Sequence, residues 1–360
     1  MKVLYIAPEN VTGGFDLFIA GHRLRGNEAR YVLFFRTQFE FGEDICFDLK
    51  WMPTLNHIRW LKAISQRWRN GNETVESKGN PPFWQPAGRL EAAFFKIRDA
   101  LNARQIRRVI DKYGLNNFDI YHFEQGVDPF RDGRWIVELA GCGKGIVCFY
   151  HGSDLRNRGV IEAVHKWSRL NLTSEIDLLR RLSGMKYLYL PIDTEAVKPQ
   201  PRTPDGRIRI GHSARNRRLK GSDFIENLVK RLSERYPLDW VMIENVTHRE
   251  ARRMKAGCDI FIDQITDLGG WGYGASSVES LAMGIPTITR INAEVAAFLG
   301  EHPFIAADPT TLESRLVELI EEPQLREAIG EQARRWVEAR HSLPAVMDCL
   351  YEYYREAGLI

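Results

Sequence analysis

The stretch that most constrains the fold of this 360-residue chain is residues 258–286, CDIFIDQITDLGGWGYGASSVESLAMGIP. Residues 259–263 predict a buried strand, and residues 276–283 predict a short helix. The loop between them holds four glycines, Gly269, Gly270, Gly272 and Gly274. Glycine lets a backbone approach an anion closely, and the first turn of a helix offers unpaired N–H groups. The stretch therefore predicts a phosphate site formed by the backbone around Gly274, Ala275 and Ser276.

Glu279 lies about one turn into the predicted helix. Its carboxylate can accept two hydrogen bonds from the vicinal hydroxyls of a ribose while the phosphates rest on the loop. The alternative is a tight strand-to-helix turn with a capping carboxylate. This stretch alone leaves both interpretations open.

The bulk composition narrows the class of protein. A chain of 360 residues, 44% of them hydrophobic, has the material for two ordinary domains. The 50 basic and 47 acidic residues give a net charge of +3, so the totals do not support nucleic-acid binding. The five cysteines form no C-x-x-C pair, which favours reduced thiols and no zinc site. The apolar run at residues 1–7 is too short for a signal peptide, and no apolar run is long enough to span a membrane, so we expect a soluble cytoplasmic protein.

The first half opens as a β-loop-α-β unit, which is how a doubly wound α/β domain begins. Residues 2–7 predict a strand, residues 15–25 a helix and residues 29–35 a second strand. The first loop carries Gly13 and Gly14 but lacks G-x-G-x-x-G, which counts against a dinucleotide oxidoreductase. These two glycines would either face a site at the end of the strand or form a flexible turn.

Residues 118–123 and 145–150 predict two further buried parallel strands. The second strand is followed at once by His151 and then, within the same turn, by Asp154. A strand that delivers both side chains to the switch-point edge of a parallel sheet makes a candidate site. The alternative is a histidine that caps the next turn.

The second half repeats the α/β pattern after a proline-rich segment at residues 198–204. Residues 208–212 predict a strand, and the following loop, SARNRRLKG, holds four cations: Arg215, Arg217, Arg218 and Lys220. Guanidinium and ammonium groups together hold the spread charge of a diphosphate well. Such a loop can also serve solubility alone, but beside the glycine-rich loop it predicts a diphosphate clamp.

Residues 57–70 and 89–113 predict two basic amphipathic helices. The apolar side of the second helix would carry Leu90, Phe94, Ile97, Leu101, Ile106 and Ile110. The simpler interpretation is a helix packed on a sheet with a solvated basic face. The functional interpretation is a surface that docks on anionic lipid headgroups, which the aromatic residues Trp60, Trp68, Phe83 and Trp84 would suit.

Taken in order, these motifs resemble the GT-B glycosyltransferases, in particular the large retaining group called family 4, over essentially the whole chain. ARNRRLKG looks like the phosphate loop of that family, with Arg215 and Lys220 at the usual offset. YHGSD carries what looks like its active-site histidine, His151, and LPIDTEAVKP is similar to its interdomain segment, with Asp193 at the aspartate. GYGASSVESLAMGIP is similar to its donor-binding block, with Glu279 at the second of two spaced glutamates.

One position departs from the family pattern. The first of the two glutamates would stand where this chain has Trp271. In the family that carboxylate lies close to the transferred sugar, so here Trp271 would stack on a sugar face, or Asp267 would supply the missing acceptor. Some subgroups with similar loops carry a preceding aspartate-glutamine pair, here Asp263 and Gln264, so the departure does not by itself imply an inactive protein.

The resemblance implies an α/β fold with two Rossmann-like doubly wound domains that face a central cleft. Residues 1–190 would bind the acceptor and residues 191–343 a nucleoside-diphosphate sugar, with the C-terminal helix, residues 344–360, packed back onto the first domain. The reaction would move a sugar, with retention, to a hydroxyl of a saccharide, a lipid-linked saccharide or a small metabolite. No D-x-D triplet occurs, which agrees with a protein-supplied cation clamp, no metal and no cofactor.

The expected roles follow from the same resemblance. His151 and Asp154 would act at the reacting sugar, while Arg215 and Lys220 would stabilise the departing diphosphate. The donor would be held by the following residues: Glu279, Gly274, Ala275, Ser276, Trp271, Tyr273, Gly13 and Gly14.

Three alternatives stay open at this point. A nucleotide-sugar epimerase shares the fold but would need acidic residues around the sugar, which the tryptophan at position 271 disfavours. A catalytically silent sugar-nucleotide-binding module would account for the same tryptophan. A membrane scaffold would use the basic helices without chemistry. For the enzyme we expect a cytoplasmic location with peripheral contact at the inner face of the membrane.

Overall fold

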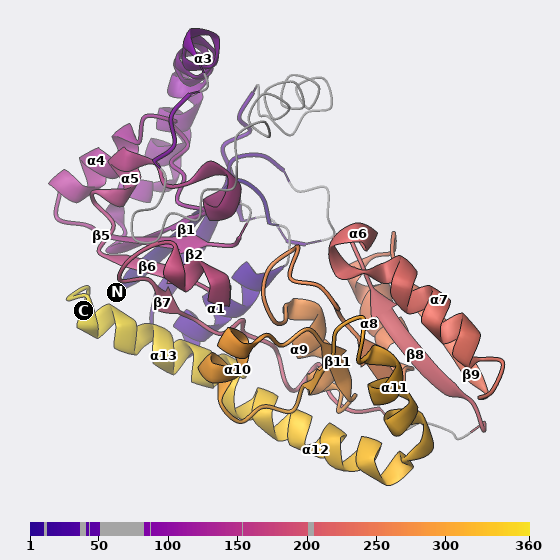
Figure 1. Ribbon diagram of the computed structural model, residues 1–360. Coiled ribbons are helices and arrows are strands. Elements are labelled where there is room, and N and C mark those ends of the chain that lie inside the picture. The colour runs from indigo at the N-terminus through magenta and orange to yellow at the C-terminus, as the bar shows by residue number, and fades with distance from the viewer. Residues whose placement is uncertain are drawn as a thin grey trace. The chain divides into compact units, whose positions relative to one another are not determined.

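The computed structural model describes residues 1–10, 13–36, 41–42, 44–50, 83–86, 88–152, 154–200 and 205–360. The chain divides into two compact units (Figure 1). The first unit comprises Met1–Ser174, Leu178–Leu188 and Leu350–Ile360, and the second comprises Glu175–Asp177 and Tyr189–Cys349. The predicted helix at residues 57–70, with Trp60 and Trp68 of the lipid-docking surface, lies outside the described residues.

The first unit is built on a seven-stranded sheet with the order β3-β2-β1-β4-β5-β6-β7, in which every neighbouring pair is parallel. The strands are β1 (Lys2–Ala7), β2 (Glu28–Leu33), β3 (Ile45–Cys46), β4 (Ile120–Glu124), β5 (Gly145–Tyr150), β6 (Leu170–Thr173) and β7 (Lys186–Tyr187). The apolar runs of the sequence form the central strands, because a parallel sheet covered on both faces buries every side chain of such a strand.

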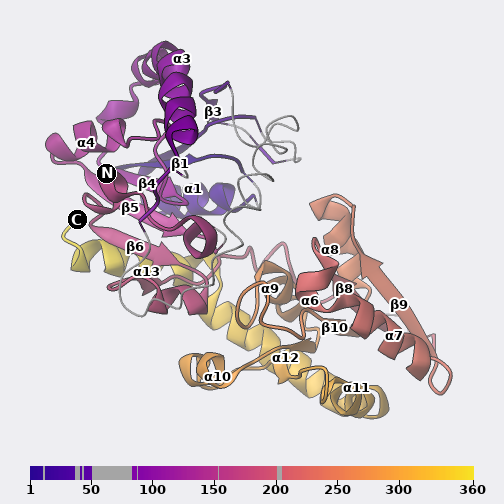
Figure 2. The same cartoon turned by 45° about the horizontal axis from the view of Figure 1, so that its top comes forward.

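Helices cover both faces of this sheet (Figures 1 and 2). They are α1 (Gly14–Leu24), α3 (Arg89–Tyr113), α4 (Arg134–Gly141), α5 (Glu162–His165) and the last turns of α13 (Leu343–Glu356), joined by the short turns η1 (Leu115–Asn117), η2 (Asp154–Arg158) and η3 (Ile176–Arg180). Successive residues of β1 alternate between the faces. Leu4 and Ile6 share a hydrophobic core with α3 and α4, whereas Tyr5 stacks on Phe18 of α1 with ring centroids 5.6 Å apart.

The C-terminal turns of α13 pack against the first unit. The Tyr351 hydroxyl lies 2.9 Å from His22 Nδ1 of α1, and the Tyr353 hydroxyl donates a hydrogen bond of 2.9 Å to the Tyr187 carbonyl of β7. The Tyr354 hydroxyl is hydrogen-bonded to His122 of β4. These polar contacts fix the end of the chain on the face of the sheet that α1 covers.

The predicted apolar side of α3 is wrong over the first half of the helix. Leu90, Ile97 and Leu101 are 89%, 52% and 56% exposed. The inward positions there are polar: Arg98, Asp99 and Asn102. Hydrogen bonds to neighbouring backbone offset part of the cost of burying them. Arg98 Nη2, for example, donates to the Pro129 carbonyl at 2.6 Å.

The second unit holds a five-stranded parallel sheet with the order β12-β11-β10-β8-β9. Its strands are β8 (Ile208–Ser213), β9 (Leu238–Ile243), β10 (Ile260–Ile262), β11 (Thr287–Thr289) and β12 (Ile305–Ala306). Its helices are α6 (Arg217–Lys220), α7 (Ser222–Leu232), α8 (His248–Ala256), α9 (Ala275–Ala282), α10 (Ala293–Leu299), α11 (Leu312–Glu321) and α12 (Pro323–Arg340). The predicted fold class, α/β with two doubly wound sheets, is confirmed.

Each sheet has one point at which the strand order reverses, and ligands of doubly wound sheets bind beside the carboxyl ends of the strands at that point. In the first unit the reversal lies between β1 and β4, and in the second it lies between β8 and β10. β8 runs into the loop that carries Arg215, and β10 runs into Asp263 and the glycine-rich loop. The fold therefore brings the two predicted phosphate-binding loops to one edge of the second sheet.

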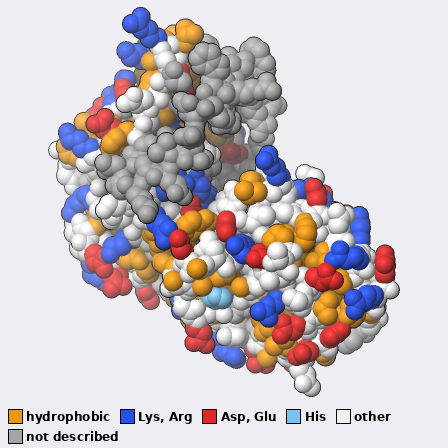
Figure 3. Space-filling model, viewed as in Figure 1, with side chains coloured by type: hydrophobic (Ala, Val, Ile, Leu, Met, Phe, Trp, Pro, Cys, Tyr) orange, Lys and Arg blue, Asp and Glu red, His pale blue; other side chains and the backbone are white. Residues whose placement is uncertain are grey.

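The surface carries charges of both signs. Figure 3 shows basic and acidic side chains interspersed on the face turned to the viewer, as the near balance of 50 basic and 47 acidic residues implies. Within the ranges given above, every helix is too short or too polar to span a bilayer.

Candidate functional site

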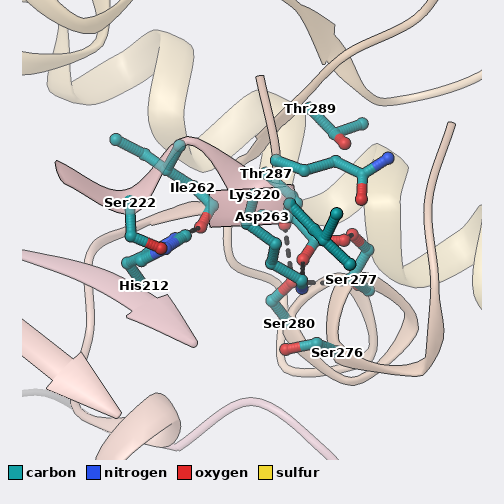
Figure 4. Close-up of polar contacts among 12 residues, drawn as sticks. His212, Lys220, Ser222, Ile262, Asp263, Ser276, Ser277, Ser280, Thr287 and Thr289 are labelled. Carbon is teal, nitrogen blue, oxygen red and sulfur yellow. Dashed lines mark hydrogen bonds and ion pairs between the residues drawn. The ribbon is translucent and has the colours of Figure 1, made fainter. Parts of the chain in front are cut away.

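Lys220, at the end of α6, forms an ion pair with Asp263, which follows β10 directly (Figure 4). The Asp263 side chain is 1% exposed, and its second oxygen accepts a hydrogen bond of 2.5 Å from Ser277 Oγ of α9. Burial alone would raise the pKa of Asp263, but the Lys220 ammonium and the Ser277 hydroxyl lower it, so the carboxylate is ionised. One buried charge thus joins the basic loop, the end of β10 and α9.

His212, on β8 just before the basic loop, links three elements of the second unit. Its Nδ1 lies 2.7 Å from the Ile262 carbonyl and its Nε2 lies 2.7 Å from Ser222 Oγ. Burial lowers the pKa of His212 to about 4, so the ring is neutral and Nδ1–H donates to the carbonyl. The ring ties β8 to β10 and to the first residue of α7.

The other cations of the basic loop have different surroundings. Arg217 pairs with Asp223 at 2.8 Å, Glu226 at 2.5 Å and Glu244 at 3.5 Å, so its charge is already balanced within the second unit. Arg215 and Arg218 are exposed. Lys220 pairs with one carboxylate, Asp263, whereas Arg217 is engaged by three.

Side-chain hydrogen bonds shape the glycine-rich loop. Gln264 Nε2 donates to the carbonyls of Gly270 at 3.0 Å and Gly272 at 3.2 Å, and Thr289 Oγ1 donates to Gly272 at 2.8 Å. Gly272 has φ +79°, and a Cβ there would lie 3.0 Å from Val295 Cγ1. Only glycine fits this position without strain.

The two aromatic residues of the loop lie in different surroundings. Trp271 is partly exposed. Tyr273 is 8% exposed and packs on Phe304, Trp336 and His341, with its hydroxyl 3.2 Å from His341 Nε2. The Tyr273 ring thus belongs to an aromatic cluster of the second unit. Asp267, considered as a substitute for the missing glutamate, pairs with Arg290 at 3.3 Å.

The N-terminus of α9 follows the loop. Gly274 precedes the helix, and among the described residues no side chain caps it. A Cβ at Gly274 would meet no atom within 4 Å, so the space before Ala275 and Ser276 is open. An uncapped first turn beside an ammonium group is an arrangement that binds a phosphate.

Glu279 is held by two side chains that the sequence did not indicate, the ammonium of Lys255 and the ring of His248. Lys255 Nζ lies 2.7 Å from Glu279 Oε2 and also donates to Ser276 O and Oγ at 3.0 and 2.9 Å. His248 Nε2 lies 2.7 Å from Glu279 Oε1. Burial would raise the pKa of Glu279, but Lys255 and His248 lower it to about 2. The carboxylate is therefore ionised and fixed in orientation.

The first unit holds the second group of predicted residues. His151 follows β5, and its Nε2 is hydrogen-bonded to Glu124 at the end of β4. Glu124 is 5% exposed, and burial raises its pKa although His151 acts in the opposite direction. The Asp154 carboxylate accepts the backbone N–H of His151 at 2.9 Å. Asp154 thus fixes the turn, and Glu124 orients the ring.

Gly13 and Gly14 lie at the end of the loop after β1. Gly13 has φ +70°, precedes α1 and donates its N–H to Asn10 Oδ1 at 3.0 Å. A Cβ at Gly13 would lie 2.5 Å from Phe41 Cδ1, so this backbone conformation requires glycine. Gly14 is the first residue of α1.

Six of the eight predicted donor residues lie on the second unit, in the glycine-rich loop and on α9: Trp271, Tyr273, Gly274, Ala275, Ser276 and Glu279. His151, Asp154, Gly13 and Gly14 lie on the first unit. Within the described ranges, no group of three or more His, Cys, Asp or Glu side chains is placed to ligate a metal ion. The partners that the sequence did not reveal are Lys255, His248 and Glu124.

Comparison with known proteins supports the fold. A family model described as "Glycosyl transferase-like" matches residues 195–351, and a search of curated protein sequences found no match. The chain is similar to HepE from Anabaena in complex with UDP and glucose, with TM-score 0.57 and 14% identity over 99% of both chains. It is also similar to a glycosyltransferase from Rickettsia africae, with TM-score 0.60 and 13% identity over 99% of this chain and 98% of that one.

A third similar structure is sucrose-phosphate synthase from Thermosynechococcus elongatus, with TM-score 0.56 and 12% identity over 99% of this chain and 98% of that one. Identities this low show the fold alone. The chain therefore has the GT-B fold of glycosyltransferases.

Proposed function

We propose that the protein is a glycosyltransferase that moves a sugar from a nucleoside-diphosphate sugar to a hydroxyl of an acceptor. The observation that carries the proposal is the arrangement around α9. An ionised buried Asp263 fixes Lys220 beside an uncapped helix N-terminus, and an ionised Glu279 lies one turn further along the same helix. The ammonium and the helix N-terminus suit a diphosphate, and the carboxylate one turn further on suits the hydroxyls of the attached ribose.

The donor would lie across the second unit. Its diphosphate would rest on the backbone N–H groups of Gly274, Ala275 and Ser276 and on the cations Lys220 and Arg215. The ribose hydroxyls would donate to Glu279, whose orientation Lys255 already fixes. Trp271 is available for the sugar face because its side chain is partly exposed. The solved HepE structures contain UDP, UDP and glucose, or UDP-glucose, which makes UDP the first nucleotide to test.

In the transfer step, the bond between the anomeric carbon and the β-phosphate oxygen breaks, and a bond from the acceptor oxygen to that carbon forms. Negative charge develops on the departing phosphate, where Lys220 and Arg215 stabilise it. The departing phosphate accepts the proton of the acceptor hydroxyl, as in the retaining family 4 enzymes. His151, oriented by Glu124, would hold the sugar near its reacting carbon. No step of this scheme uses a metal or a cofactor.

The experiment is turnover by the purified protein with UDP-, GDP- and ADP-sugars and a mixed pool of saccharide and lipid-linked acceptors. We expect acceptor-dependent release of one nucleoside diphosphate. His151→Ala should lower the rate about 100-fold and leave the affinity for the nucleotide unchanged, because the nucleotide site lies on the second unit. An isomerised nucleotide sugar would instead identify an epimerase. Binding without any release would identify a silent sugar-nucleotide-binding module.

The cellular setting is part of the proposal. We place the enzyme in the cytoplasm, where nucleotide sugars are the donor substrates, in peripheral contact with the inner face of the membrane. The exposed leucines of α3 and the basic residues between them favour such contact, since an apolar stripe beside cations suits an anionic bilayer surface.

A further inference from the structure

Three arginines gather in the first unit away from the groups described above. Arg98 lies on α3 and is 4% exposed, Arg131 lies in the loop before α4, and Arg158 ends η2. Arg131 and Arg158 are partly buried. Guanidinium groups withdrawn from water need carboxylates or other anions around them, because an unbalanced buried charge is costly.

Carboxylates balance the charge of this cluster only in part: Asp99 and Asp128 act on Arg98, and Asp154 acts on Arg158. Arg98 has a carboxylate neighbour, Asp99, with 3.6 Å between Nη1 and Oδ1. The side chain of Arg158 donates only to carbonyls, those of Gly159 at 3.1 Å and of Gln125. Over the described part of the chain, neither Arg131 nor Arg158 forms an ion pair, and the buried Nε atoms of Arg98 and Arg131 have no hydrogen-bond partner.

Arg131 is the most crowded of the three. Its guanidinium lies 3.9 Å from the centre of the Trp84 ring and 4.7 Å from that of Phe95. Burial and the charges of Arg158 and Arg98 lower the pKa of Arg131 to about 9, while the carboxylates Glu91 and Asp99 act in the opposite direction. A stacked guanidinium that repels two others is stabilised by a bound anion.

The cluster lies at the edge of the sheet where β4 and β5 end. Tyr150, which acts on Arg158, belongs to the core beneath α3 and α4. Glu124 acts on Tyr5 and Tyr354, on the opposite face of the sheet. Glu124 ends β4, and the next residue, Gln125, has φ +60° and accepts the hydrogen bond from Arg158 through its carbonyl. Arg158 ends the π-helical turn that begins at Asp154, and such turns are frequent at functional sites. The two strand ends that carry Glu124 and His151 therefore also hold Arg158.

Tyr150 lies beside Arg158. It is 0% exposed, and its hydroxyl is next to the Cys148 thiol. A Cβ on Gly126 would lie 2.7 Å from this hydroxyl, so Tyr150 reaches the turn at which Arg158 is bonded.

We propose that Arg131 and Arg158 bind an anionic group of the acceptor, a phosphate or a carboxylate, at the edge of the sheet where β4 and β5 end. The assignment rests on the proposed function, because it names the class of acceptor that the transferase uses. Arginine holds both kinds of anion through paired N–H groups. A neutral saccharide without such a group would leave the cluster partly unbalanced and would be a poor acceptor.

The first test is binding of inorganic phosphate at constant ionic strength, measured by the shift of the thermal unfolding midpoint, with the nucleotide site of the second unit kept saturated. Phosphate should raise the midpoint of the wild type. Arg131→Met and Arg158→Met should weaken phosphate binding at least tenfold. Arg134→Met is the matched control, since Arg134 lies three residues further on and pairs with Asp132 at 2.5 Å; it should bind phosphate like the wild type.

A second test separates the sources of the anion. Soluble sugar phosphates, uronic acids and vesicles with phosphate-linked saccharides are offered as acceptors to the wild type and to Arg131→Met, and the KM for each acceptor is compared with that for the donor. A rise of at least tenfold in acceptor KM alone supports the assignment and identifies the source. Equal phosphate binding by the wild type and Arg131→Met, or efficient turnover of neutral acceptors only, would overturn it. Phosphate binding without turnover of any acceptor would contradict the transferase and leave the anion site standing.

Discussion

Replacing Lys220 by methionine should lower the free energy of unfolding of the second unit, even when no ligand is present. The substitution leaves the Asp263 carboxylate, 1% exposed, with Ser277 as its remaining side-chain donor. Breaking a buried pair costs roughly 3–5 kcal/mol, and Lys220 is 23% exposed, so the lower end applies. The loss of stability cannot exceed about 4 kcal/mol, because the stranded Asp263 can take up a proton instead, and neutralising a carboxyl of ordinary pKa at pH 7 costs about that much. We therefore expect a loss of about 3 kcal/mol.

The pH dependence of this loss has a definite sign. In the wild type Lys220 lowers the pKa of Asp263, and in the variant burial without the ammonium raises it. The difference in unfolding free energy is therefore full at neutral pH and shrinks as the pH falls toward 4 and Asp263 takes up a proton. Urea denaturation of both proteins between pH 4 and pH 7 measures it.

A second substitution separates stability from binding. Asp263→Asn in the Lys220→Met background removes the stranded charge and should recover more than half of the lost stability. It should not recover affinity for a nucleoside diphosphate, which we expect to be at least tenfold weaker in both variants. Lys230→Met, at an ammonium 65% exposed, is the control and should change stability by less than about 0.5 kcal/mol. Unchanged stability of Lys220→Met, or no recovery in the double variant, would refute the role of this pair.

Three further predictions concern other features. The ionised Glu279 stabilises the wild type by about 3 kcal/mol above pH 4.5, as the shift in its pKa implies, and this stability is lost as the pH falls through about 2. Glu279→Gln should lack this contribution. Acid titration of the circular dichroism of both proteins tests this, and parallel curves would contradict it. Gly272→Ala should cost about 1–3 kcal/mol, because φ is +79° and Val295 is close; a urea midpoint equal to that of the wild type would contradict it. Leu90→Glu with Leu101→Glu should abolish sedimentation with anionic liposomes at low salt; if the wild type does not sediment, the α3 face is only a solvated surface.

Several elements of both units could be predicted because short-range patterns determine them. Residues 258–286 form β10, the glycine-rich loop and α9 as the sequence indicated. β6 and α10 were not predicted. Leu170–Thr173 alternates apolar and polar residues over only four positions, and it becomes a strand because β5 and β7 pair with it on both sides. That stabilisation is long-range and leaves no local pattern.

The charge partners of the candidate site could not be predicted for the same reason. Lys255 lies 24 residues before Glu279, Glu124 lies 27 before His151, and Lys220 lies 43 before Asp263. Each pair meets only because of the order of strands and helices around the sheet. The prediction of which side of α3 is buried was wrong over the first half of the helix. Polar residues such as Arg98 look solvent-exposed in the sequence, and their backbone partners are known only from the fold.

The most direct test of the donor site is calorimetric binding of UDP, GDP and ADP to the wild type, Glu279→Gln and His151→Ala. We expect one nucleotide to bind the wild type and His151→Ala equally, and to bind Glu279→Gln with about 1–3 kcal/mol less free energy, as the loss of a charged hydrogen bond implies. If no nucleotide binds the wild type, or if Glu279→Gln binds as tightly, the second unit is not a nucleoside-diphosphate site of the kind described.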